Sequence, residues 1–409
     1  MLTSSLHDLG IICSLGKDKL SVLTNLIAST NAEQSNAEFL SLNSNLLVDG
    51  QALYVGQVNA ELPCLANEKE HFDSRNNQLA LAALTQIMPT ITALKTQIKS
   101  ARIAVVIGTS TSGILEGEQA RKSHLASGVM PIDFHYSSQE MIAPADFIAS
   151  KLDAQGPVYS ISTACSSSAK ALSSAKMILE CDLADIVICG GVDTLSQLPC
   201  NGFKSLESTA QTYCNPFGSE RDGINLGEGA ALFVMSQKPA DIELLSVGES
   251  SDAYHVSAPE PNGVGALAAM KKALNSANID VQQLDYLNLH GTGTPKNDDM
   301  EAKAVAAFCQ QSVSAGSTKR FTGHTLGAAG AIEAGLTWLL LSDLNTNLLI
   351  PANKNNGDID PTLSKFKVSS GEKLDNLSLC LSNSFAFGGS NISLILGKRV
   401  GKVLGKNCE

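Results

Sequence analysis

The segment from Val158 to Leu172, VYSISTACSSSAKAL, combines a reactive residue type with a spacing that suits covalent chemistry. A strand-like apolar run leads into Cys165, and a run of small residues with helix-compatible composition follows it. A cysteine at the first turn of a helix faces unpaired backbone N–H groups and the positive end of the helix dipole. Both favour the thiolate, so the sequence predicts a nucleophile with a lowered pKa. The alternative is a small buried core cysteine.

A second segment, residues 289–301, places a histidine at the end of a strand. It reads LHGTGTPKNDDME, with His290 followed by a turn rich in glycine, threonine and proline and then by a helix. Turn glycines allow positive φ and close approach of a ligand, while Thr292 and Thr294 offer hydroxyls to a polar chain. A histidine beside such a loop is better placed for chemistry than one in mid-helix. A histidine with only a structural role is the alternative.

A third segment, residues 317–330, reads STKRFTGHTLGAAG, and we expect His324 to open its glycine-rich helix. At a helix N-terminus an imidazole is pushed toward its neutral form, which suits a hydrogen-bond donor or acceptor. Lys319 lies among small and apolar residues and needs a carboxylate if it is buried. Glu301 is the candidate partner, and a surface lysine is the alternative.

A fourth segment, residues 382–391, reads SNSFAFGGSN, which predicts a strand, a tight Gly-Gly turn and a second strand. Its backbone N–H groups, together with the N–H of Cys165, could hold a developing oxyanion. Without the other segments it would be an ordinary hairpin.

Composition narrows the class of protein. The formal net charge of −11, with no run of lysine and arginine, argues against a nucleic-acid binder. The ten cysteines contain no Cys-x-x-Cys pair, which indicates reduced thiols in a cytoplasmic protein rather than disulfides or a zinc site. The N-terminus has no signal-peptide pattern, and no apolar stretch reaches membrane-spanning length before a charged or polar residue interrupts it.

Strand-like runs alternate with helix-like segments along the chain, which predicts an α/β fold. Two helices of almost wholly small residues, 166–175 and 327–335, are expected to lie sandwiched between layers. We therefore expect two similar halves packed face to face, residues 1–240 and 241–409, that meet near 237–246. Residues 1–16 lack a clean opening strand.

Five segments of the chain, taken in their order along the sequence, resemble motifs of the decarboxylating β-ketoacyl-acyl carrier protein synthases of the thiolase-fold superfamily. They cover roughly residues 103–396 and are TACSSS at Cys165, SSDAYH at 250–255, HGTGTP at His290, STKRFTGHTLGAAG around Lys319 and His324, and NSFAFGGSN around Phe387. The resemblance implies an α/β, thiolase-like five-layer α-β-α-β-α architecture from two similar halves. It also implies elongation of fatty acid or polyketide/aryl-polyene chains.

The resemblance implies a role for each matching residue. Cys165 would accept the acyl chain from a carrier-bound thioester, and the N–H groups of Cys165 and Phe387 would form the oxyanion hole. His290 and His324 would stabilise the enolate left when a malonyl thioester loses carbon dioxide. Phe387 would also act as a gate that opens on acyl loading.

Other residues would have supporting roles. Lys319 and Glu301 would fix the charge and orientation of the histidines, and Thr292 and Thr294 would bind the phosphopantetheine arm. The implied partners are an acyl carrier protein and a second subunit, in a homodimer or in a heterodimer with a chain-length-factor-like paralogue. Neither a resident cofactor nor a metal is implied, because the substrates are carried on phosphopantetheine.

The chain departs from the family pattern in three places, and the first is the missing opening strand of residues 1–16. Ala386 stands where the family loop has a glycine between its two phenylalanines, a change that would stiffen the gate. The usual basic positions for docking the carrier protein are missing, and Arg121, Lys122 and Lys204 are the candidates to replace them.

Three related classes of protein are the alternatives. A thiolase would need a second cysteine in the last glycine loop, where this chain has Phe385 to Phe387, and a starter-unit synthase would have asparagine at His324. A chain-length factor shapes a pocket without condensing because it has lost the nucleophile. The presence of Cys165 with both histidines and Lys319 favours the catalytic subunit.

Overall fold

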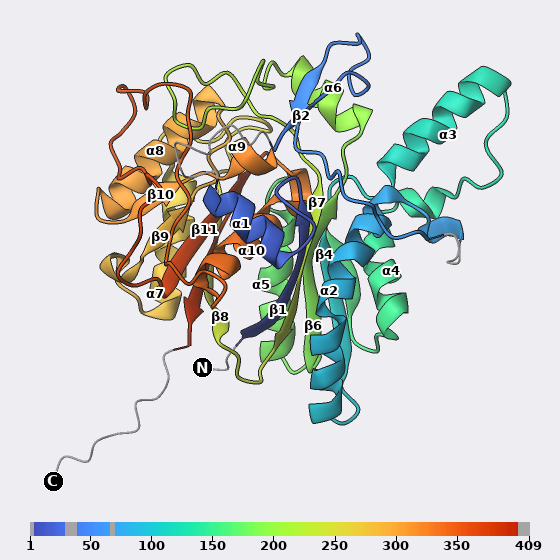
Figure 1. Cartoon of the computed structure of the whole chain (residues 1–409), viewed down its shortest axis with the longest axis horizontal. Helices are drawn as coiled ribbons and strands as arrows, with labels where there is room; N and C mark the ends of the chain where they lie inside the picture. Colours follow the sequence, from blue (N-terminus) through green and yellow to red (C-terminus); the bar gives the residue numbers. More distant parts are fainter. Residues whose placement is uncertain (1–3, 29–38, 66–69, 400–409) are drawn as a thin grey trace.

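The computed structural model describes residues 4–28, 39–65 and 70–399, and its core is one mixed sheet (Figure 1). Ten strands form this sheet in the order β10-β9-β11-β12-β8-β1-β7-β6-β4-β5, and β2 and β3 form a separate pair. The strands are β1 (Ser5–Cys13), β2 (Ser41–Asn43), β3 (Leu53–Val55), β4 (Ile103–Gly108), β5 (Val158–Ile161), β6 (Ile186–Asp193), β7 (Gly229–Ser236), β8 (Ile242–Ser251), β9 (Tyr286–Asn288), β10 (Ser314–Gly316), β11 (Leu379–Ala386) and β12 (Ser390–Lys398). The α-helices are α1 (Lys19–Ala28), α2 (Arg75–Gln97), α3 (Ile114–Ser127), α4 (Ala143–Leu152), α5 (Ser167–Glu180), α6 (Gln197–Ser205), α7 (Val264–Ala277), α8 (Pro295–Cys309), α9 (Lys319–Thr322) and α10 (Ala329–Leu341). The 3₁₀ turns are η2 (Glu70–Phe72), η3 (Tyr136–Gln139), η4 (Val281–Gln283) and η5 (Leu326–Ala328).

The sheet consists of two sets of five strands with the same order and the same directions. The first set is β1-β7-β6-β4-β5 and the second is β8-β12-β11-β9-β10. In each set the first pair and the second pair of neighbouring strands are antiparallel, and the third, fourth and fifth strands run parallel to one another. The sets join where Ser5 of β1 pairs with Glu243 of β8. The predicted boundary after residue 240 lies between β7 and β8, and as a domain boundary it stays a prediction.

Helices complete a five-layer arrangement. In the middle layer, α5 and α10 contact each other and strands of both sets. On the outer faces, α2 and α4 pack against the first set and α7 packs against the second, with α8 beside it (Figure 1). The α-β-α-β-α architecture expected from the resemblance is confirmed.

Small residues let the middle layer come close to the sheet, as the sequence predicted. An added Cβ at Gly108 of β4 would lie 2.3 Å from the Ser168 nitrogen of α5. An added Cβ at Gly330 of α10 would lie 2.7 Å from the Ala169 Cβ, so the two central helices also touch almost backbone to backbone. No larger side chain fits at these positions without a shift of the layers.

The opening strand is a correction to the sequence analysis. Residues 1–16 were expected to lack a clean strand, but β1 occupies the centre of the sheet between β7 and β8. Most of β1 is buried on both faces, yet Ser5, His7 and Asp8 interrupt its apolar residues, so it shows neither alternation nor a continuous apolar run. Two of its polar side chains have partners: His7 contacts the Ser236 hydroxyl, and Asp8 pairs with Lys19.

The parallel strands of each set deliver polar residues to one place. In the first set β5 leads to Cys165, and β6 ends at Asp193. In the second set β9 is followed by His290, and β10 leads to Lys319. Carboxyl ends of parallel strands meet at one edge of a sheet, which is where α/β proteins bind ligands.

Two further findings concern the cysteines and the helices. The nine cysteines within the described ranges all carry free thiols, and Cys408 lies outside those ranges. In the same part of the chain, no helix has both the length and the apolar character needed to cross a bilayer.

Replacing Gly108 by alanine tests the close approach of α5 to the sheet. We expect Gly108→Ala to lower the free energy of unfolding by about 1–3 kcal/mol or more, because backbone atoms of α5 must move. The matched control is Gly202→Ala in α6, where an added Cβ meets nothing within 4 Å. In that variant the free energy of unfolding should stay the same or rise by up to about 1 kcal/mol. Urea denaturation measures both, and equal effects would contradict the packing.

Candidate active site

Cys165 lies in a tight turn between β5 and α5, as predicted. Ala164 has a φ of +52°, a left-handed conformation that is strained for a residue with a side chain. The Ser167 hydroxyl stabilises this turn, because its oxygen accepts the Thr163 N–H at 2.9 Å and its proton goes to the Ala164 carbonyl. The turn leaves the Cys165 thiol buried at the base of a cavity.

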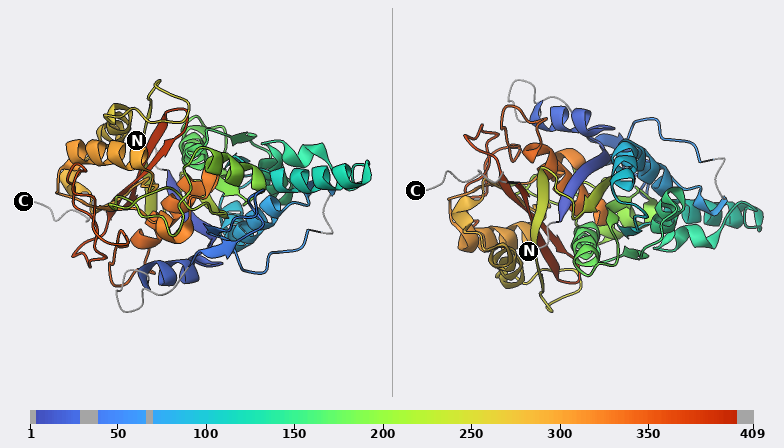
Figure 2. Two further views of the ribbon diagram at one scale, coloured as in Figure 1. Left: turned by 90° about the horizontal axis from the view of Figure 1, so that it is seen from above. Right: turned by 90° about the horizontal axis from the view of Figure 1, so that it is seen from below.

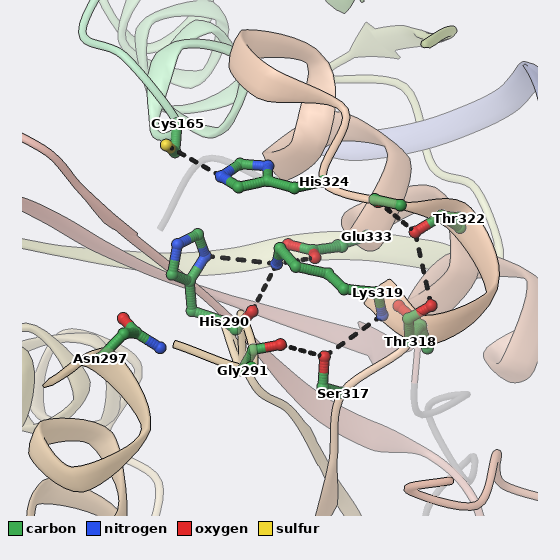
Figure 3. A network of polar contacts seen from close by, with 12 residues as sticks. Cys165, His290, Gly291, Asn297, Ser317, Thr318, Lys319, Thr322, His324 and Glu333 are labelled. Carbon is green, nitrogen blue, oxygen red and sulfur yellow. Dashed lines mark hydrogen bonds and ion pairs between the residues drawn. The ribbon is translucent and has the colours of Figure 1, made fainter. Parts of the chain in front are cut away.

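His324 lies directly beside the sulfur. Its Nε2 is 3.0 Å from Cys165 Sγ (Figure 3), and its Nδ1 accepts the N–H of Leu326 at 3.2 Å. A neutral ring that accepts at Nδ1 carries its proton on Nε2, so the imidazole donates to the sulfur. The backbone of His324 is also held, since its N–H donates to the Asn225 carbonyl at 2.6 Å.

His290 faces the same space from the loop after β9, in the same half of the fold as His324. Its Nδ1 is 3.3 Å from Lys319 Nζ, and an ammonium group can only donate. The proton of the neutral His290 ring is therefore also on Nε2. The rings of His290 and His324 are nearly perpendicular, with centroids 5.5 Å apart, and both residues are 2% exposed.

Glu301 is not the partner of Lys319, which corrects the sequence prediction. The buried ammonium of Lys319 pairs with the carboxylate of Glu333 on α10 and also donates to the His290 carbonyl (Figure 3). Glu301 instead accepts the backbone N–H groups of His290 at 2.8 Å and Gly291 at 2.6 Å. Glu301 therefore positions the loop that carries His290, and Glu333 neutralises the lysine.

A signal for Glu333 was present in the sequence. It is the only charged residue in the helix AGAIEAGLTWLLL, which is otherwise apolar or small apart from one threonine. A lone acid in a fully buried helix needs a partner, because an unpaired buried charge is costly.

Both imidazoles are held uncharged. Burial lowers the pKa of His290 and of His324 well below the usual histidine value, and the positive charge of Lys319 lowers both further. A helix start at His324 does not cause the neutral form, because α10 begins only at Ala329. The direction is as predicted, while the causes are desolvation and Lys319.

The pKa of Cys165 contradicts the sequence prediction. Burial raises the pKa of the Cys165 thiol to about 11, although Lys319 and two backbone N–H groups act in the opposite direction. Those N–H groups belong to Cys165 itself and to Phe387. In the resting protein the thiol is therefore protonated, and the two donors converge where an oxyanion would form.

Two cavities meet at Cys165. The larger, of about 350 Å³, is lined by Cys165, both histidines, Thr292 and Thr294. The hydroxyls of these threonines contact each other at 2.9 Å. The smaller cavity, of about 230 Å³, has a mostly apolar lining that includes Ile114, Leu198 and Leu326.

Two phenylalanines stand between the cavities. Phe387 and Phe203 each line both, and their ring centroids lie 5.6 Å apart. Ala386 ends β11 and is paired with Ser390 across the Gly-Gly turn. The predicted strand-turn-strand is confirmed, whereas Phe203 was not identified from sequence.

The site suits hydrogen bonding to an oxygen better than metal binding. The donor atoms of Cys165, His290 and His324 lie within 4.8 Å of one another, a spacing that a metal ion could bridge. A metal needs a lone pair on each imidazole. Here each ring accepts a hydrogen bond at Nδ1 and carries its proton on Nε2. Metal binding at Nε2 would move that proton to Nδ1, where it would face another donor: the Leu326 N–H in the case of His324, or the Lys319 ammonium in the case of His290.

The candidate docking residues do not lie together. Lys204 is exposed on α6, between Phe203 and Leu206 of the larger cavity. Arg121 and Lys122 are exposed on α3, which projects from the body (Figure 2) and contributes no residue to that cavity.

Two family models match most of the chain. The "Beta-ketoacyl synthase, N-terminal domain" matches residues 55–240, and the "Beta-ketoacyl synthase, C-terminal domain" matches residues 242–351. Among curated proteins, the 3-oxoacyl-[acyl-carrier-protein] synthase 2 of Coxiella burnetii is 33% identical over 321 residues, which cover 73% of this chain and 75% of that protein. The enzyme of the same name from Staphylococcus aureus is 32% identical over 317 residues, with the same coverage of 73% and 75%.

Solved structures agree with these matches. The ketosynthase ApeO, solved in complex with its chain length factor ApeC from Xenorhabdus doucetiae, is similar with a TM-score of 0.90 and 41% identity over 97% of this chain and 98% of that one. A β-ketoacyl synthase from Burkholderia phymatum has a TM-score of 0.81 and 26% identity, covering 98% of this chain and 100% of the other.

A double-mutant cycle tests which acid neutralises Lys319. Lys319→Met combined with Glu333→Gln should show a coupling energy of about 1–3 kcal/mol in urea denaturation, because the two groups share a buried ion pair. The matched cycle with Glu301→Gln should show a clearly smaller coupling, since Glu301 contacts backbone N–H groups instead. Larger coupling to Glu301 would reverse the assignment.

Proposed function

The chain belongs to the β-ketoacyl synthase family, and we propose that it joins an acyl group held on Cys165 to a malonyl thioester with loss of carbon dioxide. As a member of this family it is a condensing enzyme, an acyltransferase. The roles are assigned from one arrangement of groups. A thiol and two uncharged Nε2–H donors lie together in a cavity large enough for a thioester arm.

In the first half-reaction Cys165 takes the acyl group. The acyl carbonyl oxygen would accept the N–H groups of Cys165 and Phe387, the two that lower the pKa of the thiol in the resting protein. A bond forms between Sγ and the acyl carbon, the bond from that carbon to the pantetheine sulfur breaks, and the thiol proton ends on the departing pantetheine. His324 cannot hold this proton without becoming a cation beside Lys319.

In the second half-reaction the histidines act together. Once Cys165 is acylated, the His324 Nε2–H is released from its hydrogen bond to the sulfur. It can then donate, together with His290, to the malonyl thioester oxygen. The bond between the malonyl carbon and the carboxylate breaks, and carbon dioxide leaves. The electron pair of that bond stays behind and forms an enolate, whose oxygen both donors stabilise. The enolate carbon attacks the acyl carbonyl and Sγ leaves as a thiolate that takes up a proton. One such donor contributes about 3 kcal/mol in other enzymes.

We propose that both substrates arrive on the phosphopantetheine of an acyl carrier protein. The threonine hydroxyls of Thr292 and Thr294 line the larger cavity and would contact the amides of the arm. Phe387, which is partly exposed and stands between the cavities, would move when the acyl chain enters the smaller, apolar one. The proposed chemistry takes its reacting groups from the protein and the two thioesters, so we expect no resident cofactor. Free cysteines suit a reducing compartment, and we propose the cytoplasm.

We further propose that the working unit is a heterodimer with a chain-length-factor-like paralogue. The structure of ApeO, at 41% identity, was solved with such a factor. Two features of this chain support a large partner surface. Within the described residues, the strand β5 pairs only with β4 and forms an edge of the sheet. The projecting segment around α3 exposes Leu125, Val129 and Ile132, the last at 99% (Figure 2).

Intact-mass measurement after incubation with an acyl-carrier thioester tests the division of labour. The wild-type protein should gain the acyl mass, Cys165→Ala should not, and Cys181→Ala, which removes an exposed cysteine at the end of α5, should load normally. His324→Ala and His290→Ala should load but lose roughly a hundredfold or more in malonyl decarboxylation, as when an oxyanion donor is removed.

Equal loss of loading and decarboxylation in either histidine variant would contradict these roles, and acylation at another residue would contradict the nucleophile. Each protein is measured alone and co-expressed with a chain-length-factor-like relative. Activity of the chain alone as a homodimer would replace the heterodimer proposal.

A further inference from the structure

Asp193, at the end of β6, is a buried carboxylate for which the proposed mechanism has no role. It is 0% exposed, and among the residues described no cation lies at ion-pair distance from it. An isolated buried carboxylate is unfavourable unless hydrogen bonds compensate for its lost hydration.

Six donors converge on this carboxylate. Four bond to Oδ1: the Thr109 hydroxyl at 2.7 Å, the Ser110 N–H at 2.8 Å, and the Thr111 N–H and hydroxyl at 2.9 and 2.7 Å. Oδ2 accepts the Ser110 hydroxyl at 2.7 Å and the Gly327 N–H at 2.5 Å. Asp193 thus ties the loop after β4, in the first half of the fold, to the η5 turn in the second half.

The η5 turn is the element that sets the state of His324. The N–H of Leu326 donates to His324 Nδ1, and Leu326 has a φ of +54°, which a leucine rarely adopts unless it is held there. The next residue, Gly327, is the one that Asp193 binds. An added Cβ at Gly327 would lie 2.7 Å from Asp193 Oδ2, so only glycine allows this approach.

We propose that Asp193 is a positioning residue for condensation: by anchoring Gly327 it keeps the Leu326 N–H on His324 Nδ1 and so keeps the proton on Nε2. Without the anchor the strained turn relaxes, Nδ1 loses its donor, and the ring populates both tautomers. In the Nδ1–H tautomer His324 has no proton to give to the enolate oxygen. This inference rests on the proposed function only for its kinetic consequence.

Asp193→Asn provides the test. The asparagine can keep its oxygen toward the four donors at Oδ1, and its NH₂ group then faces the Gly327 N–H, donor against donor. We expect malonyl decarboxylation to fall about tenfold to a hundredfold, while loading of a short acyl group onto Cys165 is largely retained. In ¹⁵N-histidine spectra, with His324→Ala to assign the signals, His324 should change from one Nε2–H tautomer to a mixture.

The matched control is Thr109→Val, which removes one donor to Oδ1 and leaves the Gly327 contact in place. It should cost stability but keep the tautomer and the decarboxylation rate. If Asp193→Asn does not fold, Gly327→Ala breaks the same contact from the other side and should give the same mixture.

A folded Asp193→Asn that keeps a single Nε2–H tautomer and the wild-type decarboxylation rate would overturn the proposal. Because the spectra require no substrate, a change of tautomer in a protein without condensing activity would support the positioning role and refute the proposed function instead.

Discussion

The site depends on keeping two imidazoles uncharged next to a buried ammonium group. Two unit charges about 4 Å apart repel by roughly 4 kcal/mol at the effective dielectric constant of a protein site, so protonating His290 beside Lys319 is unfavourable even before desolvation is counted. Glu333 makes the lysine tolerable in the interior, and Lys319 in turn occupies His290 Nδ1. The result is a pair of donors that carry no charge of their own and can stabilise an anion that appears only during the reaction.

The topology explains why these groups meet. Each half presents the carboxyl ends of three parallel strands at the same place, so residues far apart in sequence converge without a long loop. The first half supplies the nucleophile and the second half supplies both donors. Small residues at Gly108 and Gly330 allow the central helices to lie close enough for a 3.0 Å contact between Cys165 and His324. Asp193 joins the halves at that point.

Local sequence patterns predicted most of the fold. The strand before Cys165, the hairpin around Phe387 and the sandwiched small-residue helices follow from periodicity and residue size, which are local properties. The errors concern quantities set by tertiary contacts. The pKa of Cys165 depends on burial, which outweighs the helix start. The partner of Lys319 depends on which of two acids the packing brings near. The strand β1 was missed because Ser5, His7 and Asp8 interrupt its apolar pattern, and the partner of His7, Ser236, lies far along the chain.

The most direct measurement of the central claim is a pH titration of ¹⁵N-labelled histidines in the resting protein, with His290→Ala and His324→Ala to assign the signals. Both rings should remain neutral, with the proton on Nε2, from neutral pH down to well below the usual histidine pKa, since burial and Lys319 lower both pKa values. A ring that gains a proton near pH 6.5, or that carries its proton on Nδ1 at neutral pH, would contradict the account.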